Sequence, residues 1–248
     1  VLKKLKEKLP SEKFVYFGDT AHVPYGNKSP KIIIGYCEKI IQFLIDKNVK
    51  LIIVACNTAS STALLTIKKI TNIPIVDVIS PSVNMACKIK NIQKIGIIGT
   101  EATINSQEYQ KQINQTNKNI QIYSKACPLF VPIIEEGLFN HDIAKQITKM
   151  YLDNIVKKIE VLILGCTHYP IMKKTIKKSI EKKLYIIDSA QTTANHVKEY
   201  LYKNKLQNKN NPTNLKNLYY VSDKVVRFNE ISKMFLDEPI TQIKQVKL

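Results

Sequence analysis

Short apolar runs alternate with longer amphipathic segments along the whole chain of 248 residues, and no other feature of the sequence limits the fold as strongly. Runs of about four to eight apolar residues are typical of strands that are buried on both faces. Eight such runs are Phe14–Asp19, Leu51–Cys56, Pro74–Ile79, Ile95–Thr100, Ile120–Cys127, Val161–Cys166, Leu184–Asp188 and Leu218–Ser222. Because parallel strands are connected through helices, the alternation predicts an α/β protein with helices on both faces of its sheets.

The segment after Ser29 shows the helical pattern most clearly. Ser29 is a favourable N-cap, and Pro30 fits the first turn of a helix. Apolar side chains then recur every three or four positions, at Ile33, Cys37, Ile40, Ile41 and Leu44. This spacing predicts an amphipathic helix with Cys37 on its buried face. Cys87 and Cys127 are also interpreted as packing residues.

One stretch of the chain occurs twice, with a cysteine at the same place in each copy. Leu51–Thr58 runs from aliphatic residues into Cys-Asn-Thr, and Val161–His168 runs from aliphatic residues into Cys-Thr-His. Each copy continues into a lysine-rich helical segment and then into a strand that bears an acidic residue. The repeat predicts two similar halves, with Cys56 and Cys166 at the carboxyl ends of equivalent parallel strands.

The repeat also predicts how the chain is divided into domains. We expect a discontinuous first domain, residues 1–82 plus 193–248, that carries Cys56, and a second domain, residues 83–192, that carries Cys166. The polar stretch 203–217 is predicted to be a solvent-facing loop. Because open α/β sheets bind ligands at the carboxyl ends of their strands, we expect the active site between the two domains.

The two cysteines are suited to acid–base chemistry. A thiol between a strand and a helix lies near the positive end of the helix dipole, which favours the thiolate. Inversion of a stereocentre needs a base on one face of the carbon and an acid on the other. Two thiols on opposite walls meet this need, because the pKa of a thiol lies close to neutrality. One such cysteine alone would be interpreted as a small core residue, whereas two in duplicated contexts favour catalysis.

The composition is that of a globular protein. Hydrophobic residues make up 44% and charged residues 23% of the chain, so a sizeable core can be buried. No apolar run reaches the roughly 20 residues that a membrane helix needs. The opening residues Val1–Lys6 are interrupted by lysines, which argues against a secretory signal. The five cysteines include no Cys-x-x-Cys pair and fit a reducing compartment, so we expect the cytoplasm.

The formal charge of +18 raises the question of a nucleic acid partner. Of 38 basic residues only Arg227 is an arginine, the residue whose planar guanidinium reads phosphates and bases best. We therefore interpret the lysines as a solvated surface and expect neither nucleic acid nor membrane as a partner. A zinc site from Cys56, Cys166 and His168 is a further alternative, although the ligand spacing matches no common zinc motif.

Five segments, in family order and over nearly the whole chain, resemble the glutamate racemases. The two cysteine segments, Ala55–Ser60 and Leu164–Pro170, carry the most specific likeness, and Asp19–Gly26 is similar to the loop that closes on the substrate in this family. The other matching segments are Ile95–Thr100 with Thr103, Ser106 and Tyr109, and Ala126–Pro132 with Glu135. The resemblance implies a cofactor-independent interconversion of L- and D-glutamate between two α/β domains, without metal. In the family this reaction supplies D-glutamate for peptidoglycan synthesis.

Carried over residue by residue, the resemblance assigns roles within these segments. Cys56 and Cys166 would be the two proton donors and acceptors. The substrate would be contacted by Tyr25, Gly26, Asn57, Thr58, Thr167 and His168. Thr100 and Thr103 would be further candidates for a carboxylate site, and His168 and Glu135 would tune Cys166. The alternative interpretation makes Thr103 a helix cap and Glu135 an exposed side chain. The family likeness also implies a homodimer.

The likeness to the family breaks down at the start of the chain. Family members begin with a strand that ends in Asp-Ser-Gly, and Val1 lies beyond that segment. In the family pattern this Asp would assist the thiol at Cys56 and hold the substrate ammonium, and the Ser would help to bind a carboxylate. We expect the loss of an inner strand to expose apolar faces and unpaired backbone groups. The sequence is therefore either a fragment of an ordinary enzyme or that of an impaired one.

Two rival functions stay open at this point. One is racemisation of another acidic amino acid within the same superfamily, which the shape of the side-chain pocket would determine. The other is a truncated, non-catalytic protein that binds through its basic surface. The paired cysteines favour an enzyme, whereas the missing strand and the charge of +18 favour the binding protein.

Overall fold

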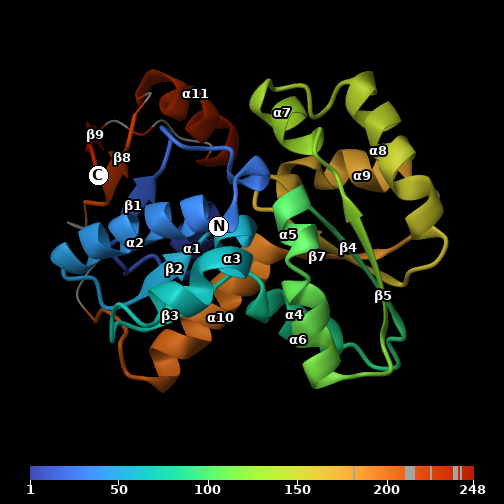
Figure 1. Ribbon diagram of the computed structural model, residues 1–248, viewed down its shortest axis with the longest axis horizontal. Helices are drawn as coiled ribbons and strands as arrows, with labels where there is room; N and C mark the ends of the chain where they lie inside the picture. The colour runs from blue at the N-terminus through green and yellow to red at the C-terminus, as the bar shows by residue number, and fades with distance from the viewer. Residues whose placement is uncertain (181, 210–215, 224, 237–239, 241) are drawn as a thin grey trace.

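The computed structural model describes residues 1–180, 182–209, 216–223, 225–236, 240 and 242–248. Helices and strands alternate along the chain and form two lobes that lie side by side (Figure 1). The strands are β1 (Val15–Gly18), β2 (Ile52–Val54), β3 (Ile75–Asp77), β4 (Lys94–Gly99), β5 (Gln121–Ala126), β6 (Val161–Gly165), β7 (Tyr185–Asp188), β8 (Leu218–Val221) and β9 (Ile243–Gln245). All strand pairs are parallel.

The helices cover the faces of these strands. The α-helices are α1 (Leu2–Lys8), α2 (Pro30–Asp46), α3 (Asn57–Ile67), α4 (Ser80–Cys87), α5 (Glu101–Asn105), α6 (Glu108–Thr116), α7 (Phe130–Glu135), α8 (Asp142–Val156), α9 (Lys173–Ser179), α10 (Ser189–Lys203) and α11 (Val225–Leu236). Two short 3₁₀ helices are η1 (Tyr25–Asn27) and η2 (Tyr169–Met172). The predicted fold class, two parallel-sheet α/β domains, is confirmed.

All eight predicted strands are confirmed, with ends that differ by at most two residues. The helix predicted after Ser29 is α2, which buries Ile33, Cys37 and Ile41 as expected. β9 was not predicted. Part of the predicted loop 203–217 lies outside the described residues, which resume at residue 216.

The second lobe is built on one sheet with the strand order β5-β4-β6-β7. Alternate side chains of β6 enter different cores: Leu162 and Leu164 join one cluster, and Val161 and Ile163 join the other. Helices α8 and α9 contribute to the first cluster, and α4 and α6 contribute to the second. Burial on both faces explains why this strand is a continuous apolar run in the sequence.

The repeat seen in the sequence is confirmed in the pairing of the strands. Val54, two residues before the first cysteine, pairs with Asp77, and Leu164, two residues before the second, pairs with Asp188. Both carboxylates accept hydrogen bonds from backbone amides at the start of the following helix. Asp77 accepts hydrogen bonds from the amides of Ile79 and Ser80 at 2.7 Å, and Asp188 is the N-cap of α10. They are therefore structural residues of the two copies.

Two helices connect the lobes. α4 leads from β3 to β4, and α10 leads from β7 back to β8, and both predicted domain boundaries fall within these helices. α10 also buries Ala194, Val197 and Leu201 against Leu5 and Leu9 of the amino-terminal segment. The exact boundaries stay a prediction.

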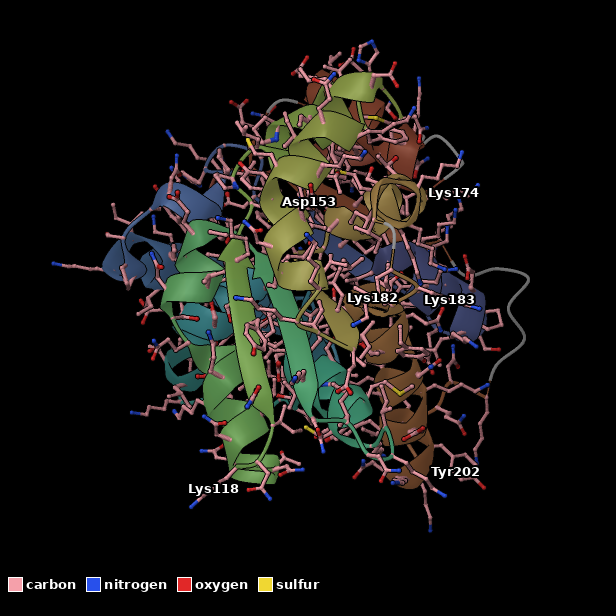
Figure 2. All side chains as sticks on the ribbon, turned by 90° about the vertical axis from the view of Figure 1, so that its right-hand side faces the viewer. Lys118, Asp153, Lys174, Lys182, Lys183 and Tyr202 are labelled. Atoms are coloured by element: carbon pink, nitrogen blue, oxygen red, sulfur yellow. The ribbon has the colours of Figure 1, made fainter. Side chains whose placement is uncertain are left out.

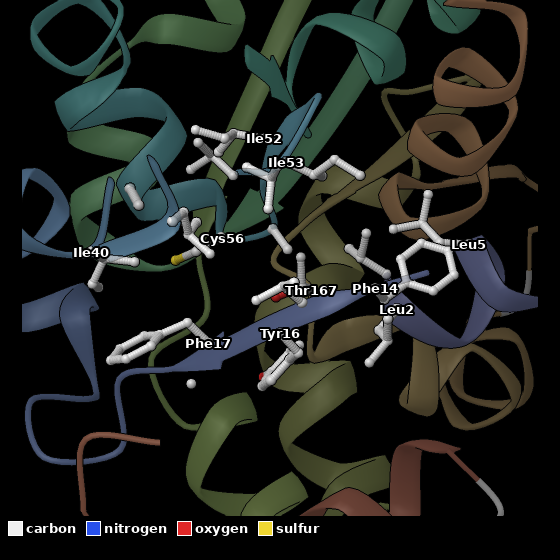
Figure 3. A pocket seen from close by; sticks show the side chains of 18 of the residues that line it. Leu2, Leu5, Phe14, Tyr16, Phe17, Ile40, Ile52, Ile53, Cys56 and Thr167 are labelled. Carbon is white, nitrogen blue, oxygen red and sulfur yellow. The ribbon is translucent and has the colours of Figure 1, made fainter. Parts of the chain in front are cut away.

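The first lobe contains two separate sheets, one with the order β1-β8-β9 and one formed by β2 and β3. β1 and β2 both line a cavity of about 1010 Å³. Figure 3 shows Leu2, Leu5 and Phe14 grouped in one part of this cavity, away from Cys56. Within the described part of the chain, β1 pairs only with β8 and β2 only with β3, so each has one unpaired edge.

The surface carries the lysines that dominate the charge. Figure 2 shows Lys118, Lys174 and Lys183 at well-separated places on one side of the molecule, as expected of a solvated surface. Among the helices in the described residues, none combines the length and the hydropathy that crossing a bilayer requires.

Candidate active site

One cavity brings together every site residue that the family resemblance singled out as catalytic or substrate-binding. Its walls include residues of both lobes. The first lobe contributes Tyr25, Gly26, Cys56, Asn57 and Thr58, and the second contributes Cys166, Thr167 and His168. Thr100 and Glu135 also line it, whereas Thr103 is buried behind the wall, at 1% exposure. Residues far apart in the sequence thus surround a single space.

Cys56 lies between β2 and α3, where it is the N-cap residue of the helix. The sequence predicts that the helix end favours the thiolate, and the amides at this helix end act in that direction. Burial raises the pKa of the Cys56 thiol above its usual value, and the neighbouring Cys166 raises it further. The backbone amides of Thr58 and Ala59 and the Thr58 hydroxyl lower the pKa but do not outweigh burial.

Thr58 links the two lobes through hydroxyl groups. Its Oγ1 lies 2.9 Å from Oγ1 of Thr100 and 3.3 Å from Oγ1 of Thr103. Thr100 is the N-cap of α5 and accepts a hydrogen bond from the amide of Thr103. The alternative interpretation of Thr103 as a helix cap is therefore wrong, since Thr100 is the cap residue and Thr103 lies within α5, with its side chain in the hydroxyl cluster. Several hydroxyls together can bind the oxygens of a carboxylate.

Gly26 brings the loop of the first lobe against this cluster. A Cβ atom added at Gly26 would lie 3.0 Å from Cβ of Thr100 and 3.2 Å from its Cγ2. At these distances, Thr100 would have to shift by a few tenths of an ångström to admit a side chain. Glycine at this position therefore permits the close approach of the two lobes beside the cavity.

Cys166 follows β6 and is 6% exposed. The sequence predicts a helix directly after it, but the first regular element is the short η2, which begins at Tyr169, and α9 starts only at Lys173. Pro170 lies in the first turn of η2 and shapes this irregular start. In Figure 3, Thr167 lies beside the same space as Cys56.

His168 connects Cys166 to Glu135. Its Nδ1 lies 3.8 Å from the Cys166 sulfur, and its Nε2 lies 3.2 Å from Oε1 of Glu135. Burial lowers the pKa of His168, but the contacts with Cys166 and Glu135 outweigh it and raise the pKa to about 10. The interpretation of Glu135 as a solvent-exposed residue without a role is wrong, since it pairs with this imidazole. The pair keeps a positive charge next to the Cys166 sulfur at neutral pH.

A network around Asp19 was not predicted from the sequence. Its carboxylate accepts hydrogen bonds from the Tyr25 hydroxyl and, at 2.8 Å, from the Ser222 hydroxyl, and it contacts His22 Nδ1 at 2.7 Å. The His22 ring stacks on Tyr36 with centroids 3.9 Å apart. Burial and the contact with Asp19 raise the pKa of Tyr25, so its hydroxyl stays protonated and donates. The network holds the loop that carries Tyr25 and Gly26 against the end of β8.

Of the remaining cysteines, Cys37 also lines the cavity, whereas Cys87 and Cys127 do not. Cys127 is fully buried, and burial raises its pKa to about 12. Burial has the same effect on Cys37, which belongs to the core around α2 and α3. Across the described ranges of the chain, no three His, Cys, Asp or Glu side chains converge as the ligands of a metal ion would.

The fold and the site together define an α/β enzyme of two lobes, with a thiol from each lobe at one cavity. Comparison with known proteins specifies the class further. A family model described as Asp/Glu/hydantoin racemase matches residues 3–197. A glutamate racemase from Geobacter metallireducens is 39% identical over 251 residues, which cover 100% of this chain and 92% of that protein.

Solved structures agree with the family model. The glutamate racemase of Francisella tularensis in complex with D-glutamate is 39% identical, covers 99% of this chain and 92% of its own, and has a TM-score of 0.92. A glutamate racemase isoform from Bacillus anthracis is 32% identical, covers 100% and 92%, and has a TM-score of 0.94. The chain belongs to the Asp/Glu/hydantoin racemase family and is an isomerase.

Proposed function

We propose that this protein is a glutamate racemase that uses Cys56 and Cys166 as its two acid–base groups. The observation that carries the proposal is that both thiols line one cavity, each at the end of an equivalent strand of its own lobe. The names of the relatives, which are glutamate racemases with 39% identity in two organisms, support glutamate as the substrate.

In the proposed reaction, the thiolate of one cysteine removes the α-hydrogen of glutamate, and the thiol of the other protonates the opposite face. The product is the other enantiomer, and each sulfur has exchanged its protonation state. The reverse reaction uses the same two groups with their roles exchanged. No net oxidation occurs, and the only groups transferred are protons.

The groups around the thiols bind the substrate and exclude water. The hydroxyls of Thr58 and Thr100 and the amide of Asn57 offer hydrogen bonds to carboxylate oxygens. His168, held by Glu135, places a positive charge beside Cys166.

The main rival substrate is another acidic amino acid, such as aspartate. A change in circular dichroism on incubation with L-glutamate, L-aspartate and their enantiomers separates these possibilities. We expect turnover of glutamate in both directions and little turnover of aspartate. Faster turnover of aspartate would assign the chain to another specificity within its family.

The wider role follows from the substrate. We propose that the D-glutamate is used for peptidoglycan synthesis in the cytoplasm and that the enzyme acts as a homodimer. Five free cysteines fit a reducing compartment. The non-catalytic basic binding protein is disfavoured by the polar groups that both lobes place around the cavity, although the charge of +18 remains its strongest support.

Glu135→Gln is expected to move the alkaline limb of the racemisation rate to lower pH. The pKa of His168, about 10, lies above its usual value, so the imidazolium persists through neutral pH and is lost as the pH rises through about 10. Without the Glu135 charge this loss occurs at lower pH. The measurement is kcat/KM for glutamate against pH, compared with Asp142→Asn, which removes an exposed carboxylate paired with Lys145. Equal profiles for Glu135→Gln and the parent would contradict the role of the pair.

Racemisation is expected to survive chelators and to proceed without pyridoxal phosphate. The two thiols and the fixed donors supply the proton transfers on their own. Purified protein is incubated with a strong chelator, dialysed and assayed, and its absorbance spectrum is recorded for a pyridoxal band. A requirement for added metal would revive the zinc alternative and overturn the proposed mechanism.

A further inference from the structure

The amide of Asn57, next to Cys56, is only half satisfied by the protein. Asn57 is 2% exposed, and its Oδ1 accepts a hydrogen bond of 2.7 Å from the Tyr109 hydroxyl. Among the described residues its Nδ2 is buried without a hydrogen-bond partner. A buried amide N–H without a partner costs free energy, so such a group is expected to be completed by a ligand. Asn57 also lines the cavity that holds both thiols.

Tyr109 determines which group of the Asn57 amide, the carbonyl oxygen or the NH₂, lacks a hydrogen-bond partner. It belongs to α6 in the second lobe and is 1% exposed. Burial raises the pKa of Tyr109 well above its usual value, so the hydroxyl keeps its proton and donates it. A donor at this place binds the carbonyl oxygen of Asn57 and turns the NH₂ group away from it. The free donor of Asn57 is thus set by a residue of the opposite lobe.

The ring of Tyr109 also touches the strand that carries the other thiol. A Cβ atom added at Gly165, directly before Cys166, would lie 3.2 Å from Cε2 of Tyr109 and 2.8 Å from the Ile98 carbonyl oxygen. Gly165 therefore lets the ring rest on the backbone of β6. One side chain contacts the residue after Cys56 through its hydroxyl and the residue before Cys166 through its ring.

We propose that Tyr109 is a positioning residue that aims the Asn57 Nδ2 donor at a substrate carboxylate and fixes the two thiol-bearing segments relative to each other. The inference rests on the proposed glutamate racemase function. Tyr109 itself does not touch the substrate. It acts through Asn57 for binding and through the β6 backbone for the spacing of the thiols.

Tyr109→Phe tests the first role, because it removes the hydroxyl and keeps the ring on Gly165. We expect KM for glutamate to rise about tenfold while kcat changes less than about threefold, since a ground-state contact is lost. Tyr109→Leu, which also removes the ring, is expected to lower kcat as well. Tyr169→Phe is the matched control, since its fully buried hydroxyl donates to the Cys127 carbonyl at 2.9 Å, away from Asn57. It is expected to lower the melting temperature similarly with KM unchanged.

A double-mutant cycle with Asn57→Ala shows whether the effect passes through Asn57. In that background, Tyr109→Phe is expected to raise KM no further. Asn57→Asp keeps an acceptor for Tyr109 but removes the N–H donor, so it should raise KM even if Tyr109→Phe folds poorly.

Three results would each overturn this role: a KM in Tyr109→Phe equal to that of the parent, a rise in KM from Tyr109→Phe that persists in the Asn57→Ala background, or a KM in Asn57→Asp equal to that of the parent. Turnover of glutamate by the parent would leave the proposed function intact in each of these cases. Absence of glutamate turnover in the parent would overturn both.

Discussion

Replacement of either Cys56 or Cys166 by alanine is expected to lower racemisation of glutamate by at least about 10³-fold, because general acid–base groups contribute effects of this order. With one thiol left, a proton can be removed from one face of the α-carbon but cannot be delivered to the other. Serine at either position is expected to keep the fold and still lose most activity, since a hydroxyl is a much weaker acid than a thiol. Circular dichroism of glutamate solutions follows the reaction directly.

Hydrogen exchange with solvent gives a second measurement of the same variants. In D₂O, the single remaining thiol is expected to exchange the α-hydrogen of only one enantiomer, and the two variants are expected to act on opposite enantiomers. Cys87→Ala is the matched control, because its thiol lies at the end of α4 and does not line the cavity. Substantial racemisation by either alanine variant, with parental activity in the control, would contradict the assignment of two acid–base cysteines.

The strands could be predicted from the sequence because they form short apolar runs, and this signal is clearest in β4 and β6, which are buried almost throughout. β6, whose five residues are all buried, is a continuous apolar run that has few alternative interpretations. β9 has the sequence Ile-Lys-Gln and two exposed residues. Its strand conformation depends on pairing with β8, and its sequence has no apolar run from which a strand could be predicted. The repeat indicated that β2 and β6 are equivalent strands, each followed by a strand with an acidic residue, because the spacing between the cysteine and the acidic residue is nearly the same in both copies.

The site could be predicted only where its residues form local motifs. Cys56 and Cys166 lie in such motifs, whereas Asp19 and Ser222 are 203 positions apart and meet only through the pairing of β1 with β8. Tyr109 and Asn57 are 52 positions apart, so their contact also depends on the tertiary fold and on no local motif. The net pKa direction at Cys56 also depends on burial, which a local helix-dipole argument leaves out.

A further parallel strand placed between β1 and β2 is expected to raise both stability and turnover. Both strands have an unpaired edge within the described residues, and the cavity of about 1010 Å³ that they line is largely apolar at the end near Leu5 and Phe14. Each buried aliphatic side chain of an added strand contributes about 1.5–3 kcal/mol, against an ordering cost of about 1–2 kcal/mol per residue. A net gain of about 2–3 kcal/mol would raise Tm by roughly 4–12 °C in a chain of this size.

The gain in turnover has a separate cause. A strand parallel to β2 ends beside Cys56, since that residue follows the carboxyl end of β2. An acidic residue at this end can assist the Cys56 thiol and bind the substrate ammonium, and a hydroxyl can bind a carboxylate. The family resemblance implies a segment that ends in Asp-Ser-Gly at this place, and such a segment, attached before Val1, is expected to increase turnover at least about 10²-fold over the chain that begins at Val1.

Parallel expression of three chains separates the two effects. They are the chain that begins at Val1, the same chain preceded by an apolar strand ending in Asp-Ser-Gly, and the extended chain with Ala-Ser-Gly in its place. Thermal melting is expected to improve in both extended chains because both fill the space between the strands, whereas the rate of D-glutamate formation is expected to increase only with the Asp. If the chain that begins at Val1 melts cooperatively and racemises as fast as the extended one, the added carboxylate is dispensable. Cys56 would then be activated by the amides and the hydroxyl of its own helix terminus alone.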